Sequence, residues 1–122
     1  MTCRTRRSAT IAIPVLLMIA AVVAVSAHHG WTGYEDKART LTGTIKASGY
    51  ENPHGYVDLD VDGKTTWRVV LAPPSRMTSR GLEKEALKVG TKATVEGYQH
   101  KTEKTEMRAE RITIGGKTVE LR

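Results

Sequence analysis

Short segments that alternate apolar and polar residues, divided by turn-forming residues, constrain the fold of this chain more than any other feature. A two-residue period is typical of a strand with one buried face. Asp62-Gly63 lies between two such segments and favours a tight hairpin. The phase of the apolar residues shifts by one position near Glu110 and Arg111, which predicts a β-bulge. The alternating segments are residues 41–48, 57–61, 67–71, 93–96, 107–114 and 119–121.

Two prolines end the third segment, and a short helical stretch follows it. Ser75 is placed to cap a helix that reaches about Leu87, while Gly81 interrupts it, so two short helical turns fit the sequence as well as one helix. Three strands, a helical connection and two or three further strands are the order of the OB-fold. We therefore predict a mainly β fold, a small five- to six-stranded OB-like, partly open barrel over residues 39–122. An open antiparallel sheet or sandwich with one helix is the alternative.

Residues 1–27 predict an export signal. Three arginines and no acidic residue stand among the first ten residues, and residues 11–25 carry no charge. Val25 and Ala27 occupy the positions where small residues precede a cleavage site. We expect cleavage after Ala27, which leaves about 95 residues in a periplasmic or secreted protein. Cleavage after Ser26 and an uncleaved anchor are alternatives, and only this segment is expected to meet a membrane.

The mature chain is only weakly basic. The 19 lysines and arginines include three in the signal, which leaves 16 against 13 acidic residues. Most of the net charge of +6 is therefore a targeting feature, and no nucleic-acid partner is expected. The only cysteine, Cys3, lies in the signal, so a metal site in the mature protein would use nitrogen and oxygen ligands.

Two histidines, His28 and His29, directly follow the predicted cleavage site. Cleavage there would give His28 a free α-amine beside its imidazole, the start of a histidine brace, and Cu(II) binds such nitrogen ligands most tightly among divalent first-row ions. Residues 28–38 show no periodicity and predict an extended arm that could span about 36 Å. In an OB-like barrel, His54 and His100 lie in the two loops that flank the ligand surface. Either histidine could complete a copper site.

Each candidate residue also has a structural interpretation. His54 could cap its own turn, and His100 stands among polar residues where a solvated side chain is expected. Trp67 alternates with apolar neighbours and is expected in the core. Trp31 and Tyr34 could pack the arm onto the barrel or line a groove for a partner. The sequence contains no nucleophile motif, phosphate-binding loop or HExxH, so a catalytic function is not favoured.

Four segments together resemble a family of small exported bacterial proteins known only as a domain of unknown function. The specific parts are the double histidine at the signal junction and the Asn-Pro-His loop. The family has no established activity or ligand set, so the resemblance implies compartment and architecture and directs attention to His28, His29 and His54. The matching segments are Ala27–Trp31, Glu51–His54, Trp67–Pro74 and Leu87–Gly97.

These observations predict an exported binding protein that holds copper through the amine and imidazole of His28 together with His54. His29 and His100 are further candidate ligands. The alternative is a metal-free interaction module that docks on an envelope protein or a glycan through the barrel face and the aromatic residues of the arm. A copper oxidoreductase is a third hypothesis, weakened because so small a chain has little surface left to hold a substrate.

Overall fold

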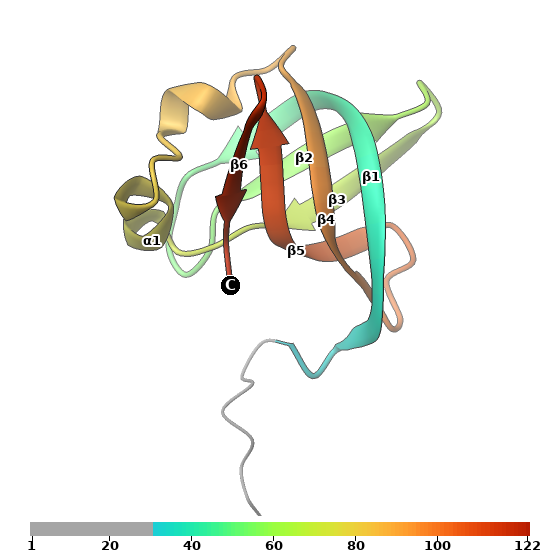
Figure 1. Ribbon diagram of the computed structural model, residues 1–122. Helices are drawn as coiled ribbons and strands as arrows, with labels where there is room; N and C mark the ends of the chain where they lie inside the picture. Colours follow the sequence, from blue (N-terminus) through green and yellow to red (C-terminus); the bar gives the residue numbers. More distant parts are fainter. Residues whose placement is uncertain (1–30) are drawn as a thin grey trace, which may run out of the picture.

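The computed structural model describes residues 31–122, so the predicted signal, His28 and His29 lie outside the described residues. The mainly β fold and the helical connection after the third strand are confirmed (Figure 1). The strands are β1 (Tyr34–Gly49), β2 (Tyr56–Val61), β3 (Thr65–Val70), β4 (Lys92–His100), β5 (Glu106–Ile114) and β6 (Lys117–Glu120), and the helical segments are α1 (Pro74–Ser79) and the 3-10 turn η1 (Lys84–Leu87).

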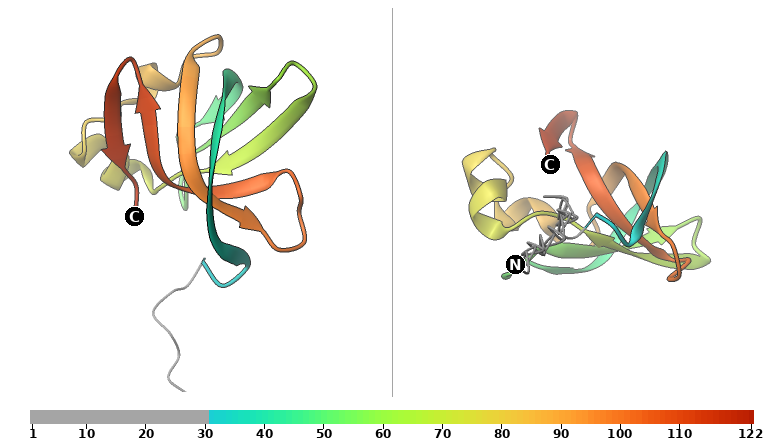
Figure 2. Two further views of the ribbon diagram at one scale, coloured as in Figure 1. Left: turned by 45° about the vertical axis from the view of Figure 1, so that its right-hand side comes forward. Right: turned by 90° about the horizontal axis from the view of Figure 1, so that it is seen from below.

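The strands form one six-stranded sheet in the order β3-β2-β1-β4-β5-β6. β3 also pairs with β5, in parallel, over Arg68 to Val70. This pairing closes five strands into a ring, β1-β2-β3-β5-β4, around a common interior (Figure 2). The other strand pairs are antiparallel, and β6 extends the sheet beyond the ring as a hairpin with β5.

The core consists of the apolar residues of the alternating segments, as their two-residue period predicts. Trp67 is 8% exposed and belongs to this core, as expected. The helical connection adds Met77 from α1 and Leu87 from η1, both buried. The other strand residues of the core are Ile45, Val57, Leu59, Val69, Ala93, Val95, Met107, Ala109, Ile112 and Val119.

β5 contains a β-bulge, where it pairs with β4, at the position that the sequence predicts. Glu96 pairs with Arg111, but the next residue, Gly97, pairs with Ala109, which leaves Glu110 as the extra residue of β5. The shift in apolar phase along β5 follows from this extra residue. A bulge bends its strand and increases its twist, and this curvature favours closure of a short sheet into a ring.

β1 begins at Tyr34, inside the arm predicted over residues 28–38, so the arm is shorter than predicted. Tyr34 pairs with His100 on β4. The four residues after Tyr34 are exposed, and no apolar alternation marks this part of the strand in the sequence. Of these four residues only Ala38 pairs with β4, opposite Tyr98, while residues 35–37 form a bulge of β1 between the paired residues Tyr34 and Ala38.

The connection between β3 and β4 forms two separate helical segments. α1 starts after Pro73, which makes no side-chain cap, so the predicted capping role of Ser75 is wrong. A proline in the first turn fixes φ near its helical value and replaces the cap here. Gly81, with φ of +84°, separates α1 from η1. The Tyr50 hydroxyl donates to the carbonyl oxygen of Leu82 at 2.7 Å and anchors the connection to the end of β1. No helix within residues 31–122 is long and apolar enough to cross a bilayer.

Candidate functional site

Trp31 lies where the chain enters the ring, and its indole contacts two guanidinium groups. The Cζ atoms of Arg108 and Arg122 are 4.6 and 4.8 Å from the centre of the indole. Tyr98 packs edge-on against the same ring at 5.7 Å. A guanidinium group over an indole face is attracted by the ring quadrupole. Trp31 therefore packs the start of the described chain against β4, β5 and the C-terminal segment.

His54 lies in the loop between β1 and β2, and its Nε2 is 3.0 Å from Nη2 of Arg108. A guanidinium group has only donors, so the imidazole Nε2 accepts and Nδ1 carries the proton. Burial, followed by the charges of Arg108 and Arg76, lowers the pKa of His54 from its ordinary value of 6.5. His54 is therefore neutral near pH 7, the form that a metal ligand requires, but Arg108 already uses its Nε2 lone pair.

Arg108 connects Trp31 to His54 and is the member of the site that the sequence did not indicate. It stands on β5 between two core residues, Met107 and Ala109, so the strand period predicts an exposed side chain. The Arg108 residue is nevertheless only 7% exposed, because the His54 loop and the Trp31 indole cover its guanidinium group. Burial is also the main cause that lowers the pKa of Arg108.

His100 is the last residue of β4, paired with Tyr34, and not a residue of the following loop as predicted, although its side chain binds that loop. Its Nδ1 accepts hydrogen bonds from the backbone N–H groups of Thr102 at 3.2 Å and Glu103 at 3.0 Å. Nε2 then carries the proton of the neutral ring and lies 3.7 Å from a carboxylate oxygen of Glu106. A neutral imidazole that binds a metal through Nε2 needs its proton on Nδ1, which would face these two donors. This geometry disfavours His100 as a metal ligand.

Tyr34 reaches the same carboxylate from the start of β1. Its hydroxyl donates to Oε2 of Glu106 at 3.1 Å, and its ring packs edge-on against His100 at 5.0 Å. Burial, followed by the charge of Glu106, raises the pKa of Tyr34 from 10.0 to about 12. Tyr34, His100 and Glu106 thus form one polar cluster at the β1–β4 end of the ring.

The Tyr34 hydroxyl should make stability sensitive to alkaline pH. Because the pKa is higher in the folded state, the unfolded chain loses this proton first as the pH rises through 10.0. The contribution of the Tyr34 hydroxyl to the free energy of unfolding is therefore complete below pH 10 and is lost as the pH approaches 12. Urea denaturation from about pH 9 to about pH 11.5 should show a smaller loss of stability in Tyr34→Phe than in the wild type. Equal losses would contradict this assignment.

The structure does not combine His54 and His100 into one metal site. Within the part of the chain that is described, no three His, Cys, Asp or Glu side chains gather as a metal site. His54 contacts Arg108, whereas His100 faces Glu106. A metal site at His54 would thus need ligands from outside the described residues, and His28 and His29 are the predicted ones.

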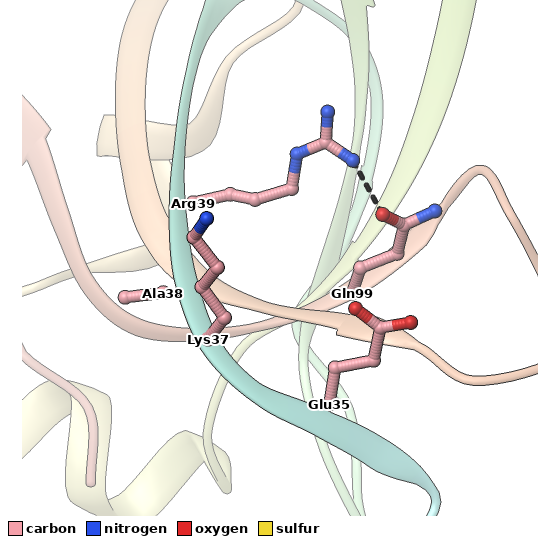
Figure 3. A pocket seen from close by; sticks show the side chains of 5 residues that line it. All are labelled: Glu35, Lys37, Ala38, Arg39 and Gln99. Carbon is pink, nitrogen blue, oxygen red and sulfur yellow. Dashed lines mark hydrogen bonds between the residues drawn. The ribbon is translucent and has the colours of Figure 1, made fainter.

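In the described part of the chain, three hollows lie in the surface near the candidate residues. A hollow of about 310 Å³ lies beside the bulge between β1 and β4 (Figure 3). There Arg39 donates to the side-chain oxygen of Gln99, as the dashed line in Figure 3 marks, and its guanidinium group lies 5.3 Å from the Trp67 ring centre. Both charge signs line this hollow, so it selects neither anions nor cations. Its lining residues are Glu35, Lys37, Ala38, Arg39 and Gln99.

Two smaller hollows border the Trp31 and His54 positions. One, of about 220 Å³, combines three aromatic side chains with charged groups, and the other, of about 230 Å³, follows the His54 loop. The structure thus places Trp31 and Tyr34 at a hollow, as a partner groove would require, and also in packing contacts. The first is lined by Trp31, Tyr34, Glu35, Asp36, Tyr98 and Arg122, and the second by Glu51–Tyr56, Arg68, Val70 and Glu106.

The closed ring with a helical connection after its third strand defines a small mainly β domain of OB-like topology. The chain belongs to the Family of unknown function (DUF6152), whose model matches residues 15–108. The predicted membership of a family of unknown function is thereby confirmed.

Among solved structures, the chain is similar to one in the crystal structure of a complex of TiaS with tRNA and ATP, with a TM-score of 0.50 and 19% sequence identity over 70% of this chain. This chain spans only 19% of that one. At this identity the likeness shows the fold alone. No curated protein matches the sequence.

Proposed function

We propose that this protein is an exported binding protein that holds copper through the α-amine and imidazole of His28 together with His54. The observation that carries the proposal is that Trp31 and His54 contact the same guanidinium group. His28 precedes Trp31 by three residues, which span about 10 Å at most. Chain length alone therefore keeps the predicted terminal chelate near the neutral imidazole of His54.

Copper binding by His54 requires a rearrangement of Arg108. An imidazole nitrogen offers one lone pair, and the guanidinium group uses it at 3.0 Å. A second positive charge beside a divalent cation is also unfavourable. The amine and imidazole of His28 could chelate copper without the ring, so the contribution of His54 decides whether the folded domain takes part.

The experiment is a titration with Cu(II) after mass spectrometry has established the N-terminus of the exported protein. Acetylation of the α-amine of His28, introduced by semisynthesis so that the lysines stay unmodified, removes this amine as a ligand, and we expect affinity to fall about a hundredfold, which corresponds to about 2.7 kcal/mol. His54→Ala should lower affinity about tenfold. His100→Asn is the matched control, because Nδ1 of His100 already serves its own loop, and it should bind copper as the wild type does.

Two outcomes would count against the proposal. If the protein with an acetylated His28 amine binds copper as tightly as the wild type, the terminal chelate does not exist. If His54→Ala binds as the wild type does, the terminus chelates copper incidentally and the ring has no part in it.

A metal-free interaction module is the second candidate function. It is favoured by the bond between Arg108 and Nε2 of His54, which occupies the predicted ligand atom, and by the aromatic hollow at Trp31 and Tyr34. Under this hypothesis, docking of an envelope protein or glycan would use the hollow without copper. The same titration separates the two functions, since an interaction module predicts copper binding that His54→Ala does not change.

A further inference from the structure

We propose that the guanidinium groups of Arg76, Arg108 and Arg122, which gather around Trp31 and His54, form a binding site for an oxyanion, the carboxylate or phosphate group of a ligand. This site does not depend on copper. It goes beyond the proposed function because it assigns a second kind of ligand to the same end of the ring.

The three arginines come from separate elements, and two of them, Arg108 and Arg122, lie at Trp31. Arg108 and Arg122 both lie over the indole, with Cζ atoms 4.6 and 4.8 Å from its centre, so the two charges are no more than about 9.4 Å apart. Arg76 projects from α1, and its Nη1 donates to the carbonyl oxygen of Leu121 at 3.1 Å, next to Arg122. In Figure 1, α1 lies on the same side of the ring as the C-terminal segment.

The positive charges of these arginines act on His54 and on Arg108. Burial is the main cause that lowers the pKa of both groups; the charges of Arg108 and Arg76 also lower that of His54, and those of Arg76 and Arg122 also lower that of Arg108. Positive charge thus accumulates at the positions where a metal cation was predicted. Like charges held together in this way are stabilised by a bound anion.

Arg122 provides the part of the site that faces solvent. A guanidinium group that stacks on an aromatic ring keeps its N–H donors in the plane of the group, where they can form the paired bonds that carboxylate and phosphate accept. Arg122 is 45% exposed in its side chain and also lies 3.9 Å from Glu110. Glu110 itself accepts a hydrogen bond from the Tyr98 hydroxyl at 2.9 Å. The adjoining hollow, which Trp31 and Arg122 line, gives access from solvent.

The test uses the full exported chain, kept metal-free with a chelator, and follows the two indole N–H signals by NMR. Inorganic phosphate and sodium acetate are added in separate titrations, with sodium chloride at matched ionic strength as the reference. We expect saturable shifts of the Trp31 signal with phosphate or acetate and none with chloride, while the Trp67 signal stays in place. Tighter binding of phosphate would assign a phosphate ligand, and tighter binding of acetate a carboxylate ligand.

Variants locate the site. Arg122→Gln should weaken anion binding about tenfold, and Arg76→Gln should weaken it similarly, while both keep the folded spectrum. Arg111→Gln is the matched control, since Glu96 and Glu120 hold Arg111 in salt bridges at 2.6 and 2.9 Å. Shifts that do not saturate, equal shifts with chloride, or full binding by Arg122→Gln would overturn the proposal. Because no copper is present, failure here leaves the copper titrations unaffected, and the reverse also holds.

Discussion

Gly97→Ala should destabilise the domain by about 3 kcal/mol or more, at the high end of single substitutions. A Cβ atom at Gly97 would overlap the carbonyl oxygen of Arg108 and lie 2.7 Å from Cα of Ala109. Both atoms belong to the backbone of β5, so no side-chain rotation can relieve the contact. β4 and β5 would have to separate at the bulge, where the ring depends on their close approach. Urea denaturation followed by circular dichroism measures the loss.

Gly116→Ala is the control for this prediction. Gly116 has φ of +79°, and an added Cβ there meets nothing within 4 Å. Only the left-handed backbone conformation opposes the substitution, at a cost of about 1–2 kcal/mol. If the two alanine variants unfold at the same urea concentration, β4 and β5 do not approach each other as closely at Gly97 as the structure indicates.

Trp67→Ala should cost about 3–5 kcal/mol, because it removes the largest side chain of the core and leaves a cavity. Trp67 is 8% exposed, pairs with Leu59 across β2 and β3, and carries the guanidinium group of Arg39 on its outer side. Neighbouring strands cannot move inward to fill the space without breaking the ring. Equilibrium denaturation in urea gives the difference from the wild type.

Trp31→Ala is the matched comparison, since it removes the same side chain at a half-buried position. Trp31 contacts Arg108, Arg122 and the edge of Tyr98. Loss of two cation–π contacts predicts a destabilisation of about 1–2 kcal/mol. Equal effects of the two substitutions would show that Trp31 is as much a part of the core as Trp67.

The candidate site could be predicted from the sequence only in part. The sequence indicated His54 and His100 because both were predicted in loops beside the ligand surface. It indicated Trp31 and Tyr34 because they are the aromatic residues of the predicted arm. It gave no indication that His100 would turn its Nδ1 to its own loop. Nor did it indicate that Arg108 would take the Nε2 of His54, because the two residues are 54 positions apart and meet only when the ring closes.

The sequence by itself determined the mainly β fold, the helical connection, the bulge at Glu110 and the buried position of Trp67. These features follow from local patterns of apolar and polar residues, since one buried face imposes a two-residue period on each strand. Only the tertiary structure decided the start of β1 at Tyr34 and the burial of Arg108. Both depend on pairing and coverage by segments distant in the chain, which leave no periodic trace in the sequence around them.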